Sequence, residues 1–161
     1  MKVRTTATAD HSAIREILLA AFPNADEANL VEQLRADGAA AIELVADDGG
    51  NIVGHTLFSP VEAPFRALSL APVAVAPDRQ GEGIGSALIE AGHELAREHG
   101  WQAIFVLGEP QYYRRFGYDP ALAAGFASPY AGDYFMALAL DGQLPTMSGE
   151  VRHAAAFQSL A

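Results

Sequence analysis

The sequence predicts a domain of the α/β (α+β) class, in which helices flank a mixed and largely antiparallel sheet. Two strands that can pair as a hairpin come early in the chain, and a strand, a glycine-rich turn, a helix and another strand follow them. The chain has 161 residues, of which 50% are hydrophobic, so it can bury a substantial core. Because this length leaves no room for a second core, we expect residues 1–161 to form a single domain.

The first forty residues are expected to form a strand and two helices. Residues 2–7 have a strand-like pattern, and a helix follows that Thr8 or Asp10 can cap and Pro23 ends. A second helix is expected to end near residue 38. In both helices the apolar residues share one face: Ile14, Ile17, Leu18, Ala21 and Phe22 in the first, and Leu30, Val31 and Leu34 in the second.

A hairpin and a third strand are expected next. Residues 43–46 and 52–58 flank Asp48-Gly49-Gly50, and this pattern is typical of two strands joined by a tight turn. Pro60 is expected to end the second hairpin strand. Residues 67–75 form another apolar run that predicts a strand.

The rest of the chain is expected to alternate helices and strands. A helix over residues 84–99 is followed by a strand over 103–107 and a short helix over 111–116. Residues 134–140 and 151–155 are expected to be the final strands.

Composition and charge exclude several kinds of partner and site. The formal net charge is −10, from 20 acidic and 10 basic side chains, and such a field repels nucleic acid. The absence of cysteine excludes disulfides and thiolate sites, and His93 and His99 lack the spacing of a helical metal pair, so no metal is expected. No apolar run is long enough to span a membrane, and the opening residues lack the apolar middle of a signal peptide, which predicts a cytoplasmic protein.

Residues 73–89 combine a buried strand, a tight turn and a helix that begins inside the turn. Gly81, Gly83 and Gly85 allow positive φ angles and a close approach of the backbone to a ligand. The free N–H groups at the start of a helix can hold a pyrophosphate such as that of coenzyme A. The spacing G-x-G-x-G fits neither of the common nucleotide loops, G-x-G-x-x-G and G-x-x-x-x-G-K-[ST]. A glycine-rich helix start without a ligand is the alternative.

Two motifs resemble those of the GNAT superfamily of N-acetyltransferases. The segment Gln80-x-x-Gly83-x-Gly85 resembles the coenzyme A loop of these enzymes, and residues 112–118 resemble their F-Y-x-x-x-G-F helix, in the same order along the chain. The stretch from Val106 also resembles a small bacterial subgroup with a V-L-G-x-P-x-Y-Y segment. The resemblance covers about the first 120 residues and implies a GNAT-like fold with acetyl-CoA as cosubstrate. The tail from Ala121 departs from a minimal member.

The resemblance implies a set of residues that bind the cosubstrate. Backbone near Val75 would pair with the pantetheine and thioester, and residues 80–86 would hold the pyrophosphate. Arg114 and Arg115 are further candidates for phosphate contacts, as is Arg79. The implied binding residues are Val73, Ala74, Val75, Arg79, Gln80, Gly81, Glu82, Gly83, Ile84, Gly85, Ser86 and Tyr113.

Candidate catalytic residues follow from the same resemblance. Tyr113 matches the tyrosine that lies near the coenzyme A sulfur in these enzymes, and it is the candidate general acid for the departing thiolate. Glu62 is the first candidate for the base, since it follows the strand that normally lines the acceptor side. His55, whose pKa is naturally near neutral, is the second candidate.

The predicted activity is transfer of an acetyl group from acetyl-CoA to a primary amine of a small molecule, peptide or protein. An alkylammonium must first lose a proton, which costs about 4.6 kcal/mol at pH 7, so a base or a water chain is needed. The alternative is a module that binds acyl-CoA without catalysis, as a sensor or structural partner. A nucleotide-binding α/β protein is disfavoured by the glycine spacing. The protein is expected to be a monomer or a homodimer.

Overall fold

The computed structural model describes residues 1–160, with side chains described up to residue 158. Within this part of the chain, a six-stranded sheet has the order β1-β2-β3-β4-β5-β7, and β6 and β8 pair separately. All neighbours in the large sheet are antiparallel except β4 and β5, which run parallel. The mixed, largely antiparallel sheet predicted from the sequence is thus confirmed. The strands are β1 (Lys2–Thr5), β2 (Ile42–Asp48), β3 (Asn51–Val61), β4 (Ala67–Val75), β5 (Ala103–Leu107), β6 (Phe126–Ala127), β7 (Phe135–Ala139) and β8 (Gly149–Glu150).

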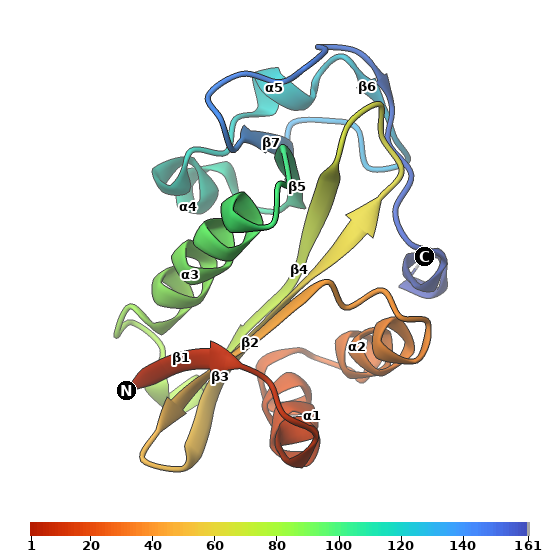
Figure 1. Ribbon diagram of the computed structural model, residues 1–161. Helices are drawn as coiled ribbons and strands as arrows, with labels where there is room; N and C mark the ends of the chain where they lie inside the picture. The colour runs from red at the N-terminus through yellow and green to blue at the C-terminus, as the bar shows by residue number, and fades with distance from the viewer. Residues whose placement is uncertain (161) are drawn as a thin grey trace.

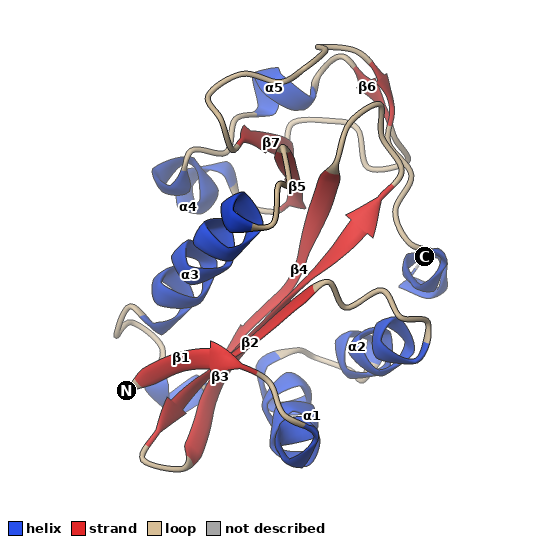
Figure 2. Ribbon diagram, viewed as in Figure 1, coloured by secondary structure: helices blue, strands red, loops and turns tan. Residues whose placement is uncertain are grey.

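Helices cover both faces of the large sheet (Figures 1 and 2). Helix α3 (Ile84–Glu98) lies on one face, and α1 (His11–Ala21) and α2 (Asp26–Ala36) lie on the other. Short helices complete the chain: α4 (Pro110–Tyr113), α5 (Pro120–Ala123), and the 3₁₀ helices η1 (Thr8–Asp10), η2 (Pro77–Arg79), η3 (Arg114–Phe116) and η4 (Ala155–Leu160). Among residues 1–160, no helix combines the length and the apolarity needed to cross a bilayer.

Strand β2 shows how alternation in the sequence supplies both cores. Leu44 and Ala46 pack in the cluster beneath α3, whereas Val45 packs in the cluster beneath α1 and α2. Successive side chains of a strand point to opposite faces, so an unbroken apolar run is what a strand covered on both sides requires. Ile14 and Leu18 of α1 meet this second cluster, as their helical spacing predicts.

The predicted end of the second hairpin strand is wrong. Pro60 does not end β3, which continues to Val61. The carbonyl of Phe58 accepts a hydrogen bond from Ala41, so residues 58 and 60 direct their peptide groups towards β2. Because β2 begins only at Ile42, the N–H that proline lacks would have had no strand partner there.

Residues 151–155 do not form the expected final strand. Arg152 makes only an isolated bridge with Glu62, and η4 begins at Ala155. The ring of His153 instead packs against Tyr130 and Phe157, with centroids 4.8 and 5.3 Å apart, so the segment turns inward to bury rings rather than extending a sheet. The strand over 134–140 is confirmed as β7, while α5, β6 and β8 were not predicted.

The contact between Gly92 and Phe58 fixes how closely α3 packs on the sheet. A Cβ atom on Gly92 would overlap the ring atoms Cε1 and Cζ of Phe58, which is fully buried. We therefore expect Gly92→Ala to destabilise the protein by about 1–3 kcal/mol through overpacking, although alanine favours a helix more than glycine. Urea unfolding midpoints measure this effect. Phe58→Leu removes the overlapping atoms, so the double variant should lose less stability than the two single variants lose in sum. Strictly additive losses of stability would contradict the packing argument.

Candidate functional site

Strands β4 and β5 separate after their first three residue pairs. Ala67, Leu68 and Ser69 pair with β5, whereas the rest of β4, residues 70–75, pairs with β3 alone among the strands that the structure describes. A bulge lies at the point of separation, because Ala71 and Pro72 together face Leu57 of β3. A bulge bends a strand and increases its twist, so β4 turns away from β5 and leaves a gap in the sheet.

The peptide groups of Val73 and Val75 face this gap. The N–H of Ala76 donates to the carbonyl of Val53 at 2.9 Å, which makes this pair a hydrogen-bonded one in the antiparallel ladder. Hydrogen-bonded and non-hydrogen-bonded pairs alternate along such a ladder. Ala74 therefore directs its N–H and C=O to β3, while Val73 and Val75 direct theirs away from β3, into the gap.

The glycine turn supplies further backbone donors at one end of the gap. Gly81 and Gly83 have φ angles of +81° and +84°, a conformation in which other residues are strained. Gly83 is the N-cap of α3, and as a glycine it has no side chain that could cap the helix. The first hydrogen bond of the helix is donated by the N–H of Ala87 to the carbonyl of Gly83. The N–H groups of Ile84, Gly85 and Ser86 therefore have no partner within the helix and lie at its positive end.

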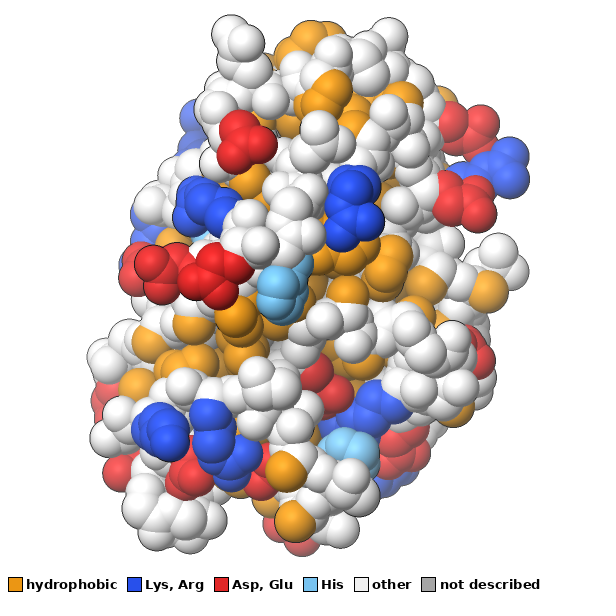
Figure 3. All heavy atoms as spheres, in the orientation of Figure 1, with side chains coloured by type: hydrophobic (Ala, Val, Ile, Leu, Met, Phe, Trp, Pro, Cys, Tyr) orange, Lys and Arg blue, Asp and Glu red, His pale blue; other side chains and the backbone are white. Residues whose placement is uncertain are grey.

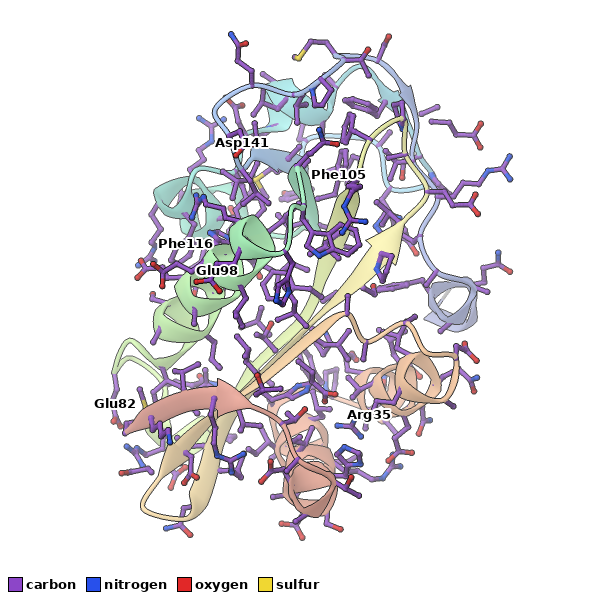
Figure 4. All side chains as sticks on the ribbon, viewed as in Figure 1. Arg35, Glu82, Glu98, Phe105, Phe116 and Asp141 are labelled. Atoms are coloured by element: carbon purple, nitrogen blue, oxygen red, sulfur yellow. The ribbon has the colours of Figure 1, made fainter. Side chains whose placement is uncertain are left out.

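These groups line a cleft of about 450 Å³, which we call the donor cleft. Of the binding residues expected from the sequence, all except Ala74 and Glu82 line it. The side chain of Ala74 is buried in the cluster under α1 and α2, and Glu82 lies on the outside of the turn, where it binds Arg79 (Figure 4). The lining residues are Val73, Val75, Arg79, Gln80, Gly81, Gly83, Ile84, Gly85, Ser86, Tyr112, Tyr113 and Arg115.

Two arginines stand beside the donor cleft. Arg79 binds Asp48 at 2.9 Å and Glu82 at 3.1 Å, and these contacts raise the pKa of its guanidinium. Arg115 donates to the carbonyl of Tyr112 at 3.1 Å and lies 4.6 Å from the centroid of the Tyr112 ring. Arg114 is not among the lining residues. On the face seen in Figure 3, basic side chains are likewise interspersed with acidic ones.

A second cleft, of about 430 Å³, opens on the far side of Tyr113, and we call it the acceptor cleft. Val73 and Tyr113 line both clefts, so the two spaces meet at the gap between β4 and β5. The acceptor cleft is lined by Phe22, Asp26, Glu27, Leu30, Ser69, Leu70, Ala71, Pro72, Val73, Leu107, Tyr113, Tyr130, His153 and Phe157.

Tyr113 is held at this junction as a neutral phenol. Burial, together with the neighbouring Tyr112, raises the pKa of Tyr113 to about 12. Its ring stands edge-to-face with Tyr112 and Tyr118, with centroids 5.0 and 5.9 Å away. A Cβ on Gly108 would overlap the Tyr113 ring, so glycine at position 108 leaves the space that the ring occupies. Tyr113 can therefore donate a hydrogen bond at any ordinary pH.

The two candidate bases from the sequence lie away from this junction. Glu62 is exposed and borders a separate hollow, where its backbone pairs with Arg152. His55 is fully buried, and its Nε2 lies 2.8 Å from Glu43, which also binds Arg35. Burial lowers the pKa of His55. Neither residue lines the donor or the acceptor cleft.

Four residues of the acceptor cleft were not identified from the sequence, namely Asp26, Glu27, His153 and Phe157. Asp26 and Glu27 at the start of α2 carry no signal that separates them from ordinary helix-terminal acids. Tyr130, His153 and Phe157 belong to the tail, for which no motif was found.

Within residues 1–160, no group of three or more His, Cys, Asp or Glu side chains is arranged to hold a metal ion.

Comparison with known proteins assigns the family. The acetyltransferase (GNAT) domain family matches residues 40–120, which run from β2 through the glycine turn to the start of α5. The chain belongs to the GNAT family. The glycine turn, the start of α3 and Tyr113 all fall within the matched region.

Similar GNAT proteins come from Escherichia coli and Brucella melitensis. The chain is 37% identical to the uncharacterised N-acetyltransferase YjhQ of Escherichia coli K12, over 91% of this chain and 88% of that protein. The crystal structure of Escherichia coli YhbS in complex with CoA superimposes with a TM-score of 0.91 at 30% identity, covering 98% of this chain and 91% of that one. A GNAT acetyltransferase of Brucella melitensis in complex with acetyl-CoA gives a TM-score of 0.81 at 36% identity, covering 97% of both chains.

If the glycine turn holds the cosubstrate, a side chain on Gly83 should weaken its binding. A Cβ at this position meets no protein atom within 4 Å, so it would project into space beside the turn and also strain the backbone. We expect Gly83→Val to weaken the binding of CoA at least about tenfold, by calorimetry, since several backbone hydrogen bonds would be lost. Gly100→Val is the matched control, because Gly100 has a φ of +80° and equal space but lies at the other end of α3. Equal affinities in the two variants would refute the assignment.

Proposed function

We propose that this GNAT protein transfers an acetyl group from acetyl-CoA to a primary amine of a small molecule, peptide or protein, by direct attack of the amine on the thioester. The meeting of the donor and acceptor clefts at Val73 and Tyr113 is the observation that carries the proposal. A thioester bound at this junction would be open to an amine from the other side of Tyr113. The CoA and acetyl-CoA complexes of the two similar structures support the choice of donor.

The donor cleft offers a hydrogen-bonding surface that matches the parts of acetyl-CoA. The amide groups of the pantetheine arm would pair with the exposed peptide groups of Val73 and Val75, as an added strand would. The pyrophosphate would accept hydrogen bonds from the turn and the first residues of α3. Arg115 stands beside this position and supplies positive charge on an otherwise acidic protein, whereas Arg79 is already paired with Asp48 and Glu82.

The reaction needs one proton to leave the amine and one to reach the sulfur. The neutral amine nitrogen attacks the carbonyl carbon, the C–S bond breaks, and the sulfur leaves as a thiolate that becomes a thiol. The carbonyl oxygen gains charge as the tetrahedral intermediate forms, and a free N–H of β4, at Val73 or Val75, can stabilise it.

Tyr113 would act on the departing sulfur. A full proton transfer from a phenol with a pKa of about 12 to a thiolate with a reference pKa of about 8.5 is uphill by about 5 kcal/mol. The useful contribution is therefore a hydrogen bond that strengthens as negative charge develops on sulfur, while Tyr113 keeps its proton and the proton that the amine releases converts the thiolate to the thiol. The cytoplasmic location and the monomeric or homodimeric state predicted from the sequence stay part of this proposal.

Tyr113→Phe tests the role of the hydroxyl without emptying the space of the ring. We expect kcat for acetyl transfer in a screen of primary amines to fall by about 10²-fold, in the range found for positioned acid–base groups. The dissociation constant of acetyl-CoA should change less than about twofold, because the hydroxyl acts at the sulfur. Tyr134→Phe is the control, since Tyr134 is 57% exposed and lines neither cleft.

Release of CoA that depends on an added amine distinguishes transfer from simple binding. Unchanged turnover in Tyr113→Phe would remove Tyr113 from the mechanism. Tight binding of acetyl-CoA with no amine-dependent release of CoA across the screen would instead favour the non-catalytic sensor.

A further inference from the structure

Two carboxylates of the first turn of α2 line the acceptor cleft. Asp26 and Glu27 stand in the first turn of α2 and both line the cleft. Among the lining residues that the structure describes, none is lysine or arginine. Two carboxylates without a basic partner favour a cationic group on the ligand and disfavour an anionic one.

Glu27 has a hydrogen-bonding capacity that the protein leaves unused. Its Oε2 atom is shielded from solvent and has no hydrogen-bond partner among the described residues. A buried carboxylate oxygen without a donor is unfavourable, because it has lost water and gained nothing in exchange. An amino group placed in the acceptor cleft would supply the missing donor.

Three aromatic rings also line the acceptor cleft. His153 lies edge-to-face between Tyr130 and Phe157, with centroids 4.8 and 5.3 Å away, and all three residues line the cleft. Burial lowers the pKa of His153 to about 4, so the imidazole is neutral near pH 7 and adds no positive charge. Its Nδ1 has no partner among the described residues. These rings suit a flat, apolar group.

The carboxylate and the rings come from parts of the chain that the fold brings together. Helix η4, which carries Phe157, packs beside α2, which carries Glu27, and Figure 1 shows the C-terminal end of the chain next to α2. The cleft volume of about 430 Å³ lies in the lower part of the range for small-molecule sites. A compact ligand that carries both an amino group and an aromatic ring matches both features.

We propose that the acceptor cleft binds arylalkylamines, with Glu27 accepting hydrogen bonds from the amino group and Tyr130, His153 and Phe157 packing against the ring. This inference deepens the proposed acetyl transfer and rests on it for the role of the amine as acceptor. Glu27 would then be the residue that contacts the amine, in place of Glu62 and His55, neither of which lines this cleft. Binding of the amine itself can be measured without turnover.

The test uses 2-phenylethylamine as the probe, titrated into the protein saturated with CoA, and as an acceptor in the acetyl-transfer assay. We expect Glu27→Gln to weaken its binding, and to raise its KM, at least about tenfold, because the charge is lost while the shape is kept. Glu32→Gln is the matched control, since Glu32 lies on the same helix, pairs with Arg15 and lines neither cleft. The dissociation constant of acetyl-CoA should change less than about twofold in both variants.

Two comparators define the ligand class. 2-Phenylethanol lacks the amino group and spermidine lacks the ring, and each should bind at least about tenfold more weakly than 2-phenylethylamine. Comparable binding of spermidine, or equal affinities in wild type and Glu27→Gln, would overturn this inference and leave the proposed transfer to other amines intact. Binding of 2-phenylethylamine that depends on Glu27, without acetylation of any amine, would uphold the inference and overturn the proposed transfer.

Discussion

The separation of β4 from β5 beyond Ser69 is the constraint on which the rest of the site depends. A sheet normally pairs the N–H and C=O groups of its inner strands, and groups left unpaired in the interior are costly. Here the bulge at Ala71 and Pro72 turns β4 away, and the peptide groups of Val73 and Val75 face a gap instead of a strand. Extended amide groups of a ligand can take the place of the missing strand. The gap is therefore both a break in the sheet and a binding surface.

The elements around the gap are fixed by packing on the two faces of the sheet. Helix α3 lies close to β3 because Gly92 admits the ring of Phe58, and this sets where the positive end of the helix meets the gap. His93 of α3 shares a hydrogen bond of 2.7 Å with Tyr118, which in turn packs against Tyr113. The same helix thus positions both the backbone donors of the turn and the phenol at the junction of the clefts.

Parts of the site that consist of adjacent residues could be predicted from the sequence, and parts that combine distant residues could not. The glycine turn and residues 112–118 are each continuous in the sequence, so most of the residues that line the donor cleft could be predicted. The acceptor cleft joins Glu27 to His153 and Phe157, more than 120 residues away, and no spacing rule connects them. Pro60 and residues 151–155 were misjudged for a related reason, because the partner of each segment, rather than its composition, decides whether a strand continues.

Amide hydrogen exchange at β4, followed by NMR with and without CoA, tests the central claim most directly. If the ligand replaces the missing strand, CoA should slow exchange at Val73 and Val75 strongly, while Ala74, whose peptide groups already face β3, should change little. ATP at the same concentration should leave all three amides unaffected. Exchange at Val73 and Val75 that CoA does not slow, although it binds, would contradict the account and place the ligand elsewhere.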